Sequence, residues 1–168
     1  MLLIHTIETP LGKMTACADE KGICLLEFSD KATLVQSLSA IQSLWRSELA
    51  EGKSPYFSLL EAELEEYFAG RLREFSVPLS LAGTDFQREV WAALQTIPYG
   101  CTISYQQQAL NIGRPQAVRA VANANGQNRI SILLPCHRVI GRNGRLTGYG
   151  GGLWRKEKLL QLEKAVLF

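Results

Sequence analysis

Apolar and polar residues alternate over much of residues 2–29 of this 168-residue chain. The runs LLIHTIET, MTACA and ICLLEFS carry the pattern, and residues 10–12 and 19–22, which separate the runs, are rich in Pro, Gly and Asp. Alternation is typical of strands that bury one face, and such separators are typical of tight turns. We therefore expect an antiparallel sheet at the start of the chain.

Helical spacing of apolar residues follows in two segments. Leu34, Leu38 and Ile41 fall on one stripe within residues 31–50. The run SPYFSLLEAELEEYFAG has proline near its start and glycine at its end, as helix termini prefer. Residues 71–83 lack this spacing and are expected to be a linker.

The second half opens with two helix-start signals. Thr84 and Gln87 have the spacing of a capping box, and so do Ser104 and Gln107. The first pair precedes apolar residues at helical spacing up to residue 97, and the second pair precedes a short helix. Each pair therefore predicts a helix.

A third helix is expected over residues 115–125, with Pro115 in its first turn. The segment IGRP joins it to the helix before, which is the pattern of a helix-turn-helix. Its polar face has no acidic residue and gathers Gln116, Arg119, Ala120, Asn123 and Gln127. Such a face could lie in a nucleic-acid groove, and an ordinary amphipathic helix explains the pattern equally well.

Charge is divided unevenly along the chain, although the net charge is only +2. Residues 1–100 carry 8 basic and 14 acidic residues, whereas residues 101–168 carry 10 basic and 2 acidic residues. A basic segment attracts polyanions, and a merely solvated basic surface is the alternative. The surplus favours a nucleic-acid partner for the second half.

The cysteines and the chain start indicate a cytoplasmic protein with no membrane contact. No signal peptide is visible, and no apolar run reaches the roughly 20 residues that cross a bilayer. Four cysteines in such a chain are not expected to form disulfides. Cys17, Cys24 and Cys101 are read as small buried residues, and no metal site is expected because no CxxC pair occurs.

The pair Cys136–His137 follows the apolar run ISILLP, which reads as a buried strand. A thiol with an ordinary pKa of about 8.5 is mostly protonated at neutral pH, so a neighbouring base makes it a better nucleophile. Neighbours on a strand point to opposite faces, which favours a water between sulfur and imidazole. Glu163, on the apolar side of the last helix, is the candidate that orients the histidine.

The segment GRNGRLTGYGGG lies between these parts. Asn143 and Gly144 suit a two-residue hairpin turn. Tyr149 followed by three glycines makes a flexible wall with one aromatic face. That wall could hold a flat heterocycle.

These segments together resemble the O6-alkylguanine-DNA alkyltransferase family, also called methylated-DNA–protein-cysteine methyltransferases. The motif PCHRV at residues 135–139 is similar to the family's active-site signature. FQREVWAALQTIPYG, SYQQ, AVRAVANANGQN, GRNGRLTGYGGG and RKEKLLQLE are similar to its flanking blocks, in the same order. The resemblance is dense over residues 84–163 and extends to TPLGK and EYFAG in the first half.

The resemblance implies an α+β fold with two domains: a ribonuclease H-like domain over residues 1–80 and a DNA-binding, alkyl-acceptor domain over residues 81–168. It implies repair of O6-alkylguanine, and of O4-alkylthymine, by irreversible and stoichiometric alkyl transfer to Cys136 after the damaged nucleotide is flipped from the duplex. The partner is double-stranded DNA, bound through its minor groove by a monomer. No cofactor is needed, because the lesion supplies the alkyl group.

The resemblance also assigns roles to residues. His137 takes the thiol proton through a water, and Glu163 orients it. Tyr105 protonates the departing guanine at N3 and crowds the phosphate, and Asn128 braces the turn before Cys136. The DNA-binding residues are Arg119, which fills the vacated stack, together with Tyr105, Gln116, Ala120, Asn123 and Arg138. The substrate pocket is formed by Val139, Tyr149 and Gly150.

Three departures from the family pattern stand out. Arg129 replaces a common proline, Gly150 replaces a serine of some members, and Gln108 replaces a usual leucine. The glycine removes bulk, so we expect tolerance of alkyl groups larger than methyl. The zinc ligands that some members carry in the first domain have no counterpart here.

Two other functions fit parts of the pattern. A cysteine hydrolase could use Cys136, His137 and Glu163, but it leaves the basic surplus and the helix-turn-helix unexplained. A lesion sensor that binds without reaction is the second, but that class within the family lacks the cysteine.

Overall fold

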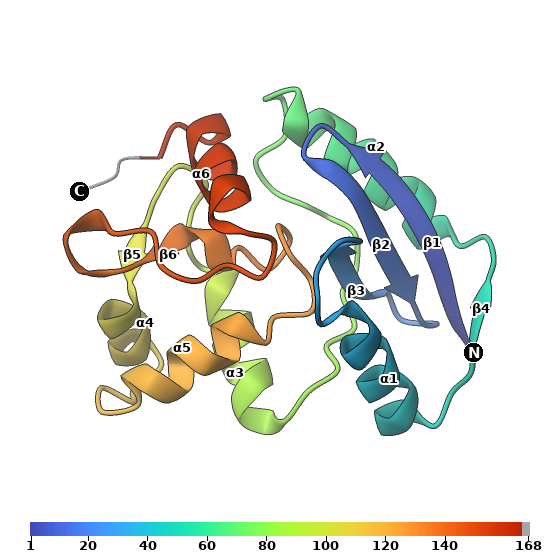
Figure 1. The fold of residues 1–168 in the computed structure, drawn as a ribbon, viewed down its shortest axis with the longest axis horizontal. Helices are drawn as coiled ribbons and strands as arrows, with labels where there is room; N and C mark the ends of the chain where they lie inside the picture. The colour runs from blue at the N-terminus through green and yellow to red at the C-terminus, as the bar shows by residue number, and fades with distance from the viewer. Residues whose placement is uncertain (166–168) are drawn as a thin grey trace. The chain divides into compact units, whose positions relative to one another are not determined.

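The computed structural model describes residues 1–165, with only the backbone of Asn143 included (Figure 1). The chain divides into two compact units, Met1–Ala82 and a second one that begins at Gly83. Each unit is described by itself below. No helix in the described range is long and apolar enough to cross a membrane.

A four-stranded sheet forms the centre of the first unit. Its strands are β1 (Leu2–Thr9), β2 (Gly12–Ala18), β3 (Ile23–Phe28) and β4 (Leu49–Glu51), in the order β3-β2-β1-β4. The first three strands pair antiparallel, as the alternation predicts. The sheet is nevertheless mixed, because β4 pairs parallel to β1. Three residues are too few to show a period, so β4 could not be predicted.

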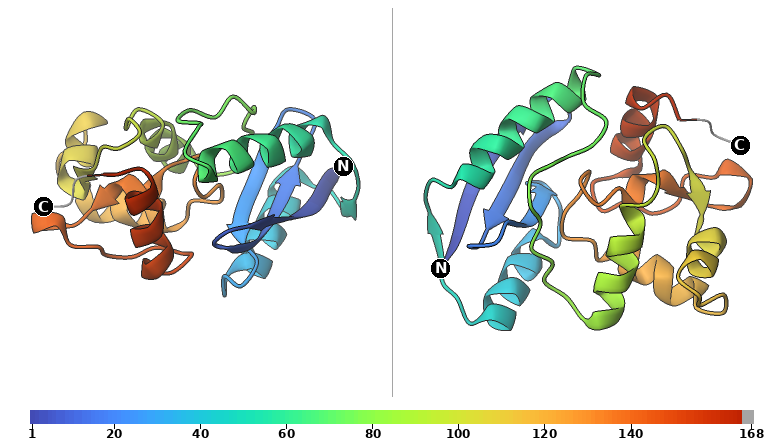
Figure 2. Two further views of the ribbon diagram at one scale, coloured as in Figure 1. Left: turned by 90° about the horizontal axis from the view of Figure 1, so that it is seen from above. Right: turned by 180° about the vertical axis from the view of Figure 1, so that it is seen from behind.

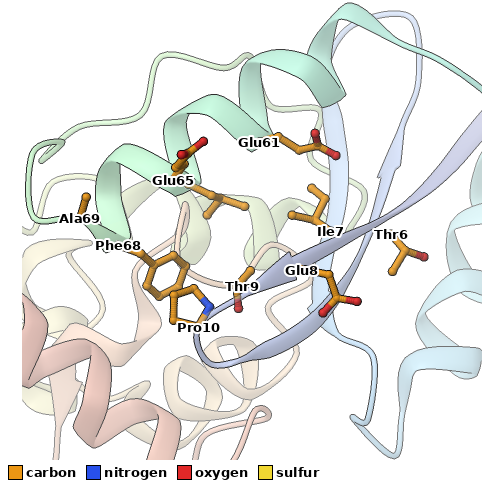
Figure 3. Close-up of a pocket in the computed structure, with 10 residues that line it drawn as sticks. Thr6, Ile7, Glu8, Thr9, Pro10, Glu61, Glu65, Phe68 and Ala69 are labelled. Atoms are coloured by element: carbon orange, nitrogen blue, oxygen red, sulfur yellow. The ribbon is translucent and has the colours of Figure 1, made fainter.

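Two helices cover opposite faces of this sheet (Figure 2). They are α1 (Leu34–Trp45) and α2 (Pro55–Phe68), and both lie within the segments predicted to be helical. α1 packs with Leu2 and Cys17 in one hydrophobic cluster. On the other face, the ring of His5 in β1 stacks on Phe57 of α2, with the ring centroids 5.1 Å apart. This unit contains an open hollow of about 680 Å³ between β1 and α2, bordered by Glu8, Glu61 and Glu65 (Figure 3).

The second unit is mainly helical and holds only two short strands among its described residues (Figure 1). Its helices are α3 (Asp85–Leu94), α4 (Tyr105–Asn111), α5 (Val118–Gly126) and α6 (Leu153–Leu162). Strands β5 (Ile103–Ser104) and β6 (Val139–Ile140) pair in parallel. Two 3-10 helices, η1 (Cys136–Arg138) and η2 (Arg142–Gly144), flank β6 in the sequence.

Capping residues begin α3 and α4 where the sequence predicts. Thr84 and Gln87 exchange both bonds of the capping box. Ser104 accepts from the backbone N–H of Gln107, but the side chain of Gln107 donates to Asn111, so the second box is only half formed. Both caps satisfy backbone N–H groups that a helix start leaves without partners.

The helix-turn-helix is held together around α5. Trp91 of α3 donates from Nε1 to the carbonyl of Ala124, at 2.8 Å. The buried amides of Gln108 in α4 and Asn125 in α5 donate to each other, at 3.0 and 2.6 Å. Gln108, at a position where the resemblance leads us to expect leucine, therefore has a polar partner that offsets its burial.

Three local predictions are wrong. α5 begins at Val118 rather than at Pro115, so Gln116 precedes the helix. Residues 131–134 form a turn rather than a strand, and Ile132 lies in the left-handed region with φ 74°. The segment of Asn143 and Gly144 forms η2 rather than a hairpin turn.

Three cysteines were expected to be buried, and the structure buries two of them. Cys17 and Cys24 are fully buried in the first unit, whereas Cys101 is exposed after Gly100. Gly100 has φ 80°, a tight turn that leaves the next side chain outside the core. In the described part of the chain, no group of three or more His, Cys, Asp or Glu side chains is placed to hold a metal.

We expect Gln108→Leu to lower the free energy of unfolding by roughly 1–3 kcal/mol, because the amide of Asn125 is left buried without its partner. The double variant with Asn125→Leu is expected to recover most of that loss, because both polar groups are then removed. Urea unfolding of the full chain measures both. A single variant as stable as the parent would contradict this account of the amide pair.

Candidate active site

Cys136 is placed by a strained turn. Ile132 adopts a backbone conformation that β-branched residues rarely occupy, and the chain then enters η1 at Cys136. The side chain of Cys136 is half-buried and forms no disulfide. A rigid turn therefore fixes a partly accessible thiol.

Asn128 holds this turn and also touches the thiol. Its Oδ1 accepts from the N–H of Ile130 at 2.9 Å, and its Nδ2 donates to the carbonyl of Leu134 at 2.8 Å. Nδ2 also donates to Sγ of Cys136 at 3.2 Å. A donor aimed at sulfur favours the thiolate over the thiol, so Asn128 both braces the turn and stabilises the nucleophile.

His137 and Glu163 form a fully buried pair at the end of α6. The His137 ring is 0 % exposed, and its Nε2 lies 2.8 Å from Oε2 of Glu163. Burial would raise the pKa of Glu163, but hydrogen bonds from His137 and Arg138 lower it below its usual range. Glu163 is therefore a carboxylate, and Nε2 of His137 is the donor.

The second ring nitrogen of His137 is the basic one. Burial lowers the pKa of His137, against the opposing effect of Glu163, so the ring is neutral at pH 7. With the proton on Nε2, Nδ1 has a lone pair. Among residues 1–165, no group forms a hydrogen bond with Nδ1. The arrangement supplies a base whose tautomer is set by the carboxylate.

Arg138, which the resemblance implies contacts DNA, is buried next to Glu163. It is 7 % exposed, and its Nε and Nη2 donate to the two oxygens of Glu163 at 2.8 and 3.0 Å. Its Nη1 donates to the carbonyl of Ile97 at 2.7 Å. The guanidinium is used to neutralise the buried carboxylate, which makes Arg138 a residue that positions Glu163.

Lys156 is a site residue that our sequence analysis missed. It is 0 % exposed, and its Nζ donates to the carbonyls of Val139, Thr147 and Gly148 at 2.7, 3.0 and 3.4 Å. It ties the glycine-rich loop to β6. The spacing of Lys156 to the buried Leu159 and Leu160 places it on the apolar side of α6, a signal that could have revealed it.

The charge of Lys156 also acts on the thiol. Burial lowers the pKa of Lys156 to about 8, and the negative charge of Cys136 opposes that shift. The interaction is mutual, so an ammonium at Lys156 favours the thiolate of Cys136 below pH 8.

Tyr105 lies at the same loop. Its hydroxyl donates to the carbonyl of Thr147 at 3.0 Å, and the Nζ of Lys156 lies 5.9 Å from its ring centroid. Burial raises the pKa of Tyr105, and the charge of Cys136 raises it further. The phenol therefore stays protonated and can act as a donor.

The predicted pocket residues and the predicted DNA residues around α5 lie on different elements of the second unit. Val139 is buried in β6, Tyr149 is half-buried, and Gly150 is exposed in the loop that Lys156 holds. On α5, the exposed side carries Arg119, Ala120 and Asn123, while Val121 and Ala124 face the core. Gln116 is exposed just before α5.

A cysteine with a built-in base and a helix-turn-helix share one compact unit, which defines a protein that carries out thiol chemistry on DNA. Residues 85–165 match the family described as 6-O-methylguanine DNA methyltransferase, DNA binding domain. Residues 2–81 match its ribonuclease-like domain. The chain belongs to the 6-O-methylguanine DNA methyltransferase family.

Relatives support this over the whole chain. A methylated-DNA–protein-cysteine methyltransferase of Mycobacterium leprae is 56% identical over 164 residues, covering 98% of this chain and 93% of the relative. A relative of the same name from Mycobacterium bovis is 46% identical over 165 residues, which cover 98% of this chain and 94% of the relative. The structure superposes on the crystal structure of Mycobacterium tuberculosis OGT in complex with DNA with a TM-score of 0.83. The two sequences are 45% identical, and the match covers 96% of this chain and 92% of the other. The resemblance and the α+β fold inferred from the sequence are confirmed.

We expect Lys156→Gln to raise the pKa of the Cys136 thiol, because a nearby positive charge is lost. Alkylation of Cys136 by iodoacetamide, followed by peptide mass against pH, measures this pKa. Lys158→Gln, an exposed site on the same helix, is the matched control. Identical profiles for Lys156→Gln and the parent would contradict a charge effect.

Proposed function

We propose that this protein repairs O6-methylguanine in DNA by transferring the methyl group to Sγ of Cys136. The thiolate attacks the methyl carbon, a sulfur–carbon bond forms, and the bond from that carbon to guanine O6 breaks. The observation that carries the proposal is the half-buried thiol beside a neutral, buried histidine whose Nδ1 is basic. Its family membership and the activity named for its relatives point to the same reaction.

The proton of the thiol passes to His137. Cys136 and His137 follow each other in η1, and a water between Sγ and Nδ1 serves as the relay. Glu163 holds the tautomer and stabilises the imidazolium that forms. Asn128 and Lys156 supply the remaining stabilisation of the thiolate.

Tyr105 serves the leaving group. As the methyl carbon departs, negative charge develops on guanine, and a protonated phenol near N3 can donate to it. Burial raises the pKa of Tyr105, which keeps the donor protonated at physiological pH. Tyr105 then regains a proton from the imidazolium of His137 by way of solvent, so the proton that the thiol lost is balanced by the one that guanine gained.

The product explains why one chain repairs one lesion. A thioether has no good leaving group, so no step returns the thiol. The protein is a stoichiometric reagent, and the lesion itself supplies the group transferred. The chemistry therefore calls for no cofactor.

DNA binding is assigned to α5 and its neighbours. Arg119, Ala120 and Asn123 are exposed on one side of α5, and the second unit has 11 basic and 4 acidic residues. Small and uncharged residues suit close approach to the minor groove, and Arg119 can fill the stack vacated by a flipped nucleotide. Gln116 and Tyr105 add contacts at the start of this surface. We expect a monomer in the cytoplasm to bind double-stranded DNA in this way.

The flipped base is expected to lie among Val139, Tyr149 and Gly150. Gly150 is exposed and adds no side-chain bulk, which supports tolerance of alkyl groups larger than methyl. Repair of O4-alkylthymine is proposed from the family resemblance alone. A strong preference for methyl over butyl lesions would contradict the proposed role of Gly150.

The decisive experiment measures the intact mass of the protein after mixing with duplex DNA that contains O6-methylguanine. We expect one added methyl group per chain, mapped to the peptide of Cys136, and no further repair when lesions are in excess. A Cys136→Ala variant should remove the reaction and keep DNA binding. Repeated turnover would favour a hydrolase, and repair or signalling retained without the thiol would favour a sensor.

A further inference from the structure

Part of strand β1 has an open edge. β1 lies between β2 and β4, but β4 pairs only with residues 2–4 of β1. Within the described chain, no strand pairs with residues 6–9 of β1 on the side away from β2. A strand edge of this kind offers backbone groups to which another extended segment can add.

The backbone groups along this edge belong to Thr6 and Glu8. The N–H of Leu2 donates to the carbonyl of Glu48 at 3.0 Å, just before β4, so the backbone groups of Leu2 point away from β2. In an antiparallel strand these groups alternate in direction from one residue to the next. Thr6 and Glu8 therefore point theirs to the same side as Leu2, beyond the end of β4.

The hollow between β1 and α2 lies at this open edge (Figure 3). Residues 6–10 line it on one side, and the second half of α2 lines it on the other. Leu64 and Phe68 give it apolar contacts, and its volume of about 680 Å³ is typical of a ligand site. The open edge and the hollow form one surface, which we call the β1 edge site.

The β1 edge site is acidic. Its carboxylates are those of Glu8, Glu61 and Glu65, and none of the described residues that line it is basic. Glu61 forms an ion pair with His5. Glu8 lies 3.9 Å from the ammonium of Lys13. Glu65 forms no ion pair within the described chain. Such a surface repels the phosphates of nucleic acids and attracts cations, so it calls for a basic partner.

We propose that the β1 edge site binds an extended, basic segment of a partner protein, which adds to the sheet as a further strand beside residues 6–9. The backbone of the segment exchanges hydrogen bonds with Thr6 and Glu8, and its side chains supply specificity. A lysine on the α2 side suits the site, because its apolar stem can lie on Phe68 while its ammonium reaches Glu61 or Glu65. This binding goes beyond the proposed repair reaction and does not depend on it.

Peptide binding to the full chain tests the charge requirement. The probe is a short capped peptide of alternating lysine and threonine that carries fluorescein, and its anisotropy reports binding. We expect the parent to bind it, and to bind the matching peptide of alternating glutamate and threonine at least about tenfold more weakly. Glu65→Lys should weaken binding of the lysine peptide about tenfold, because an attraction becomes a repulsion. Glu20→Lys, at an exposed glutamate of the same unit outside the hollow, is the matched control and should change it little.

Backbone pairing is tested by amide hydrogen exchange, measured by NMR. The lysine peptide should slow exchange at Thr6 and Glu8 at least about tenfold and leave Ile7, whose N–H points toward β2, nearly unchanged. A lysine peptide that is N-methylated throughout keeps its charge but cannot donate, so it should bind about tenfold more weakly.

Three results would overturn the site. The first is no binding by the parent, or equal affinity for the lysine and glutamate peptides. The second is exchange at Thr6 and Glu8 that the peptide leaves unchanged. The third is slow exchange at both amides in the protein without peptide that is lost on dilution, which would mean that a second copy of the chain covers the edge.

Discussion

The buried ion pair between Glu163 and Arg138, with His137 attached to it, is the interaction on which the rest of the site depends. A carboxylate that is 2 % exposed is costly to bury, and two hydrogen bonds from Arg138 and one from His137 offset that cost. The same contacts tie the end of α6 to η1 and, through Arg138, to the carbonyl of Ile97. Because Glu163 stays ionised, Nε2 of His137 must carry the proton, and Nδ1 is left as the base.

Two groups near the thiol, Asn128 and Lys156, favour its ionised form. The uncharged side chain of Asn128 donates a hydrogen bond to the sulfur. The ammonium of Lys156 adds a positive charge, and burial lowers the pKa of Lys156 to about 8. Lys156 also binds three carbonyls, so the glycine-rich loop and the electrostatics of the thiol depend on one side chain. Changing that loop is therefore expected to change reactivity as well as substrate fit.

The regular spacing of apolar residues and the helix-capping residues make much of the fold predictable from the sequence. α2 begins at the proline and α3 at the capping box that predict them. The antiparallel pairing of the first strands follows from the alternation of apolar and polar residues. The turn at residues 131–134 was mistaken for a strand, because its apolar residues are buried by tertiary packing and Ile132 takes a conformation its side chain disfavours. The burial of Arg138 and the role of Lys156 do not follow from the sequence, because charged residues are ordinarily exposed. Only their partners in the folded structure show why these two side chains are buried.

The central claim concerns the protonation of one ring, and nitrogen NMR of labelled protein measures it most directly. The two ring nitrogens of His137, assigned by comparison with a His137→Gln variant, report their protons through their chemical shifts. The account predicts a proton on Nε2, none on Nδ1 and a neutral ring at pH 7. A proton on Nδ1, or an imidazolium at pH 7, would contradict it.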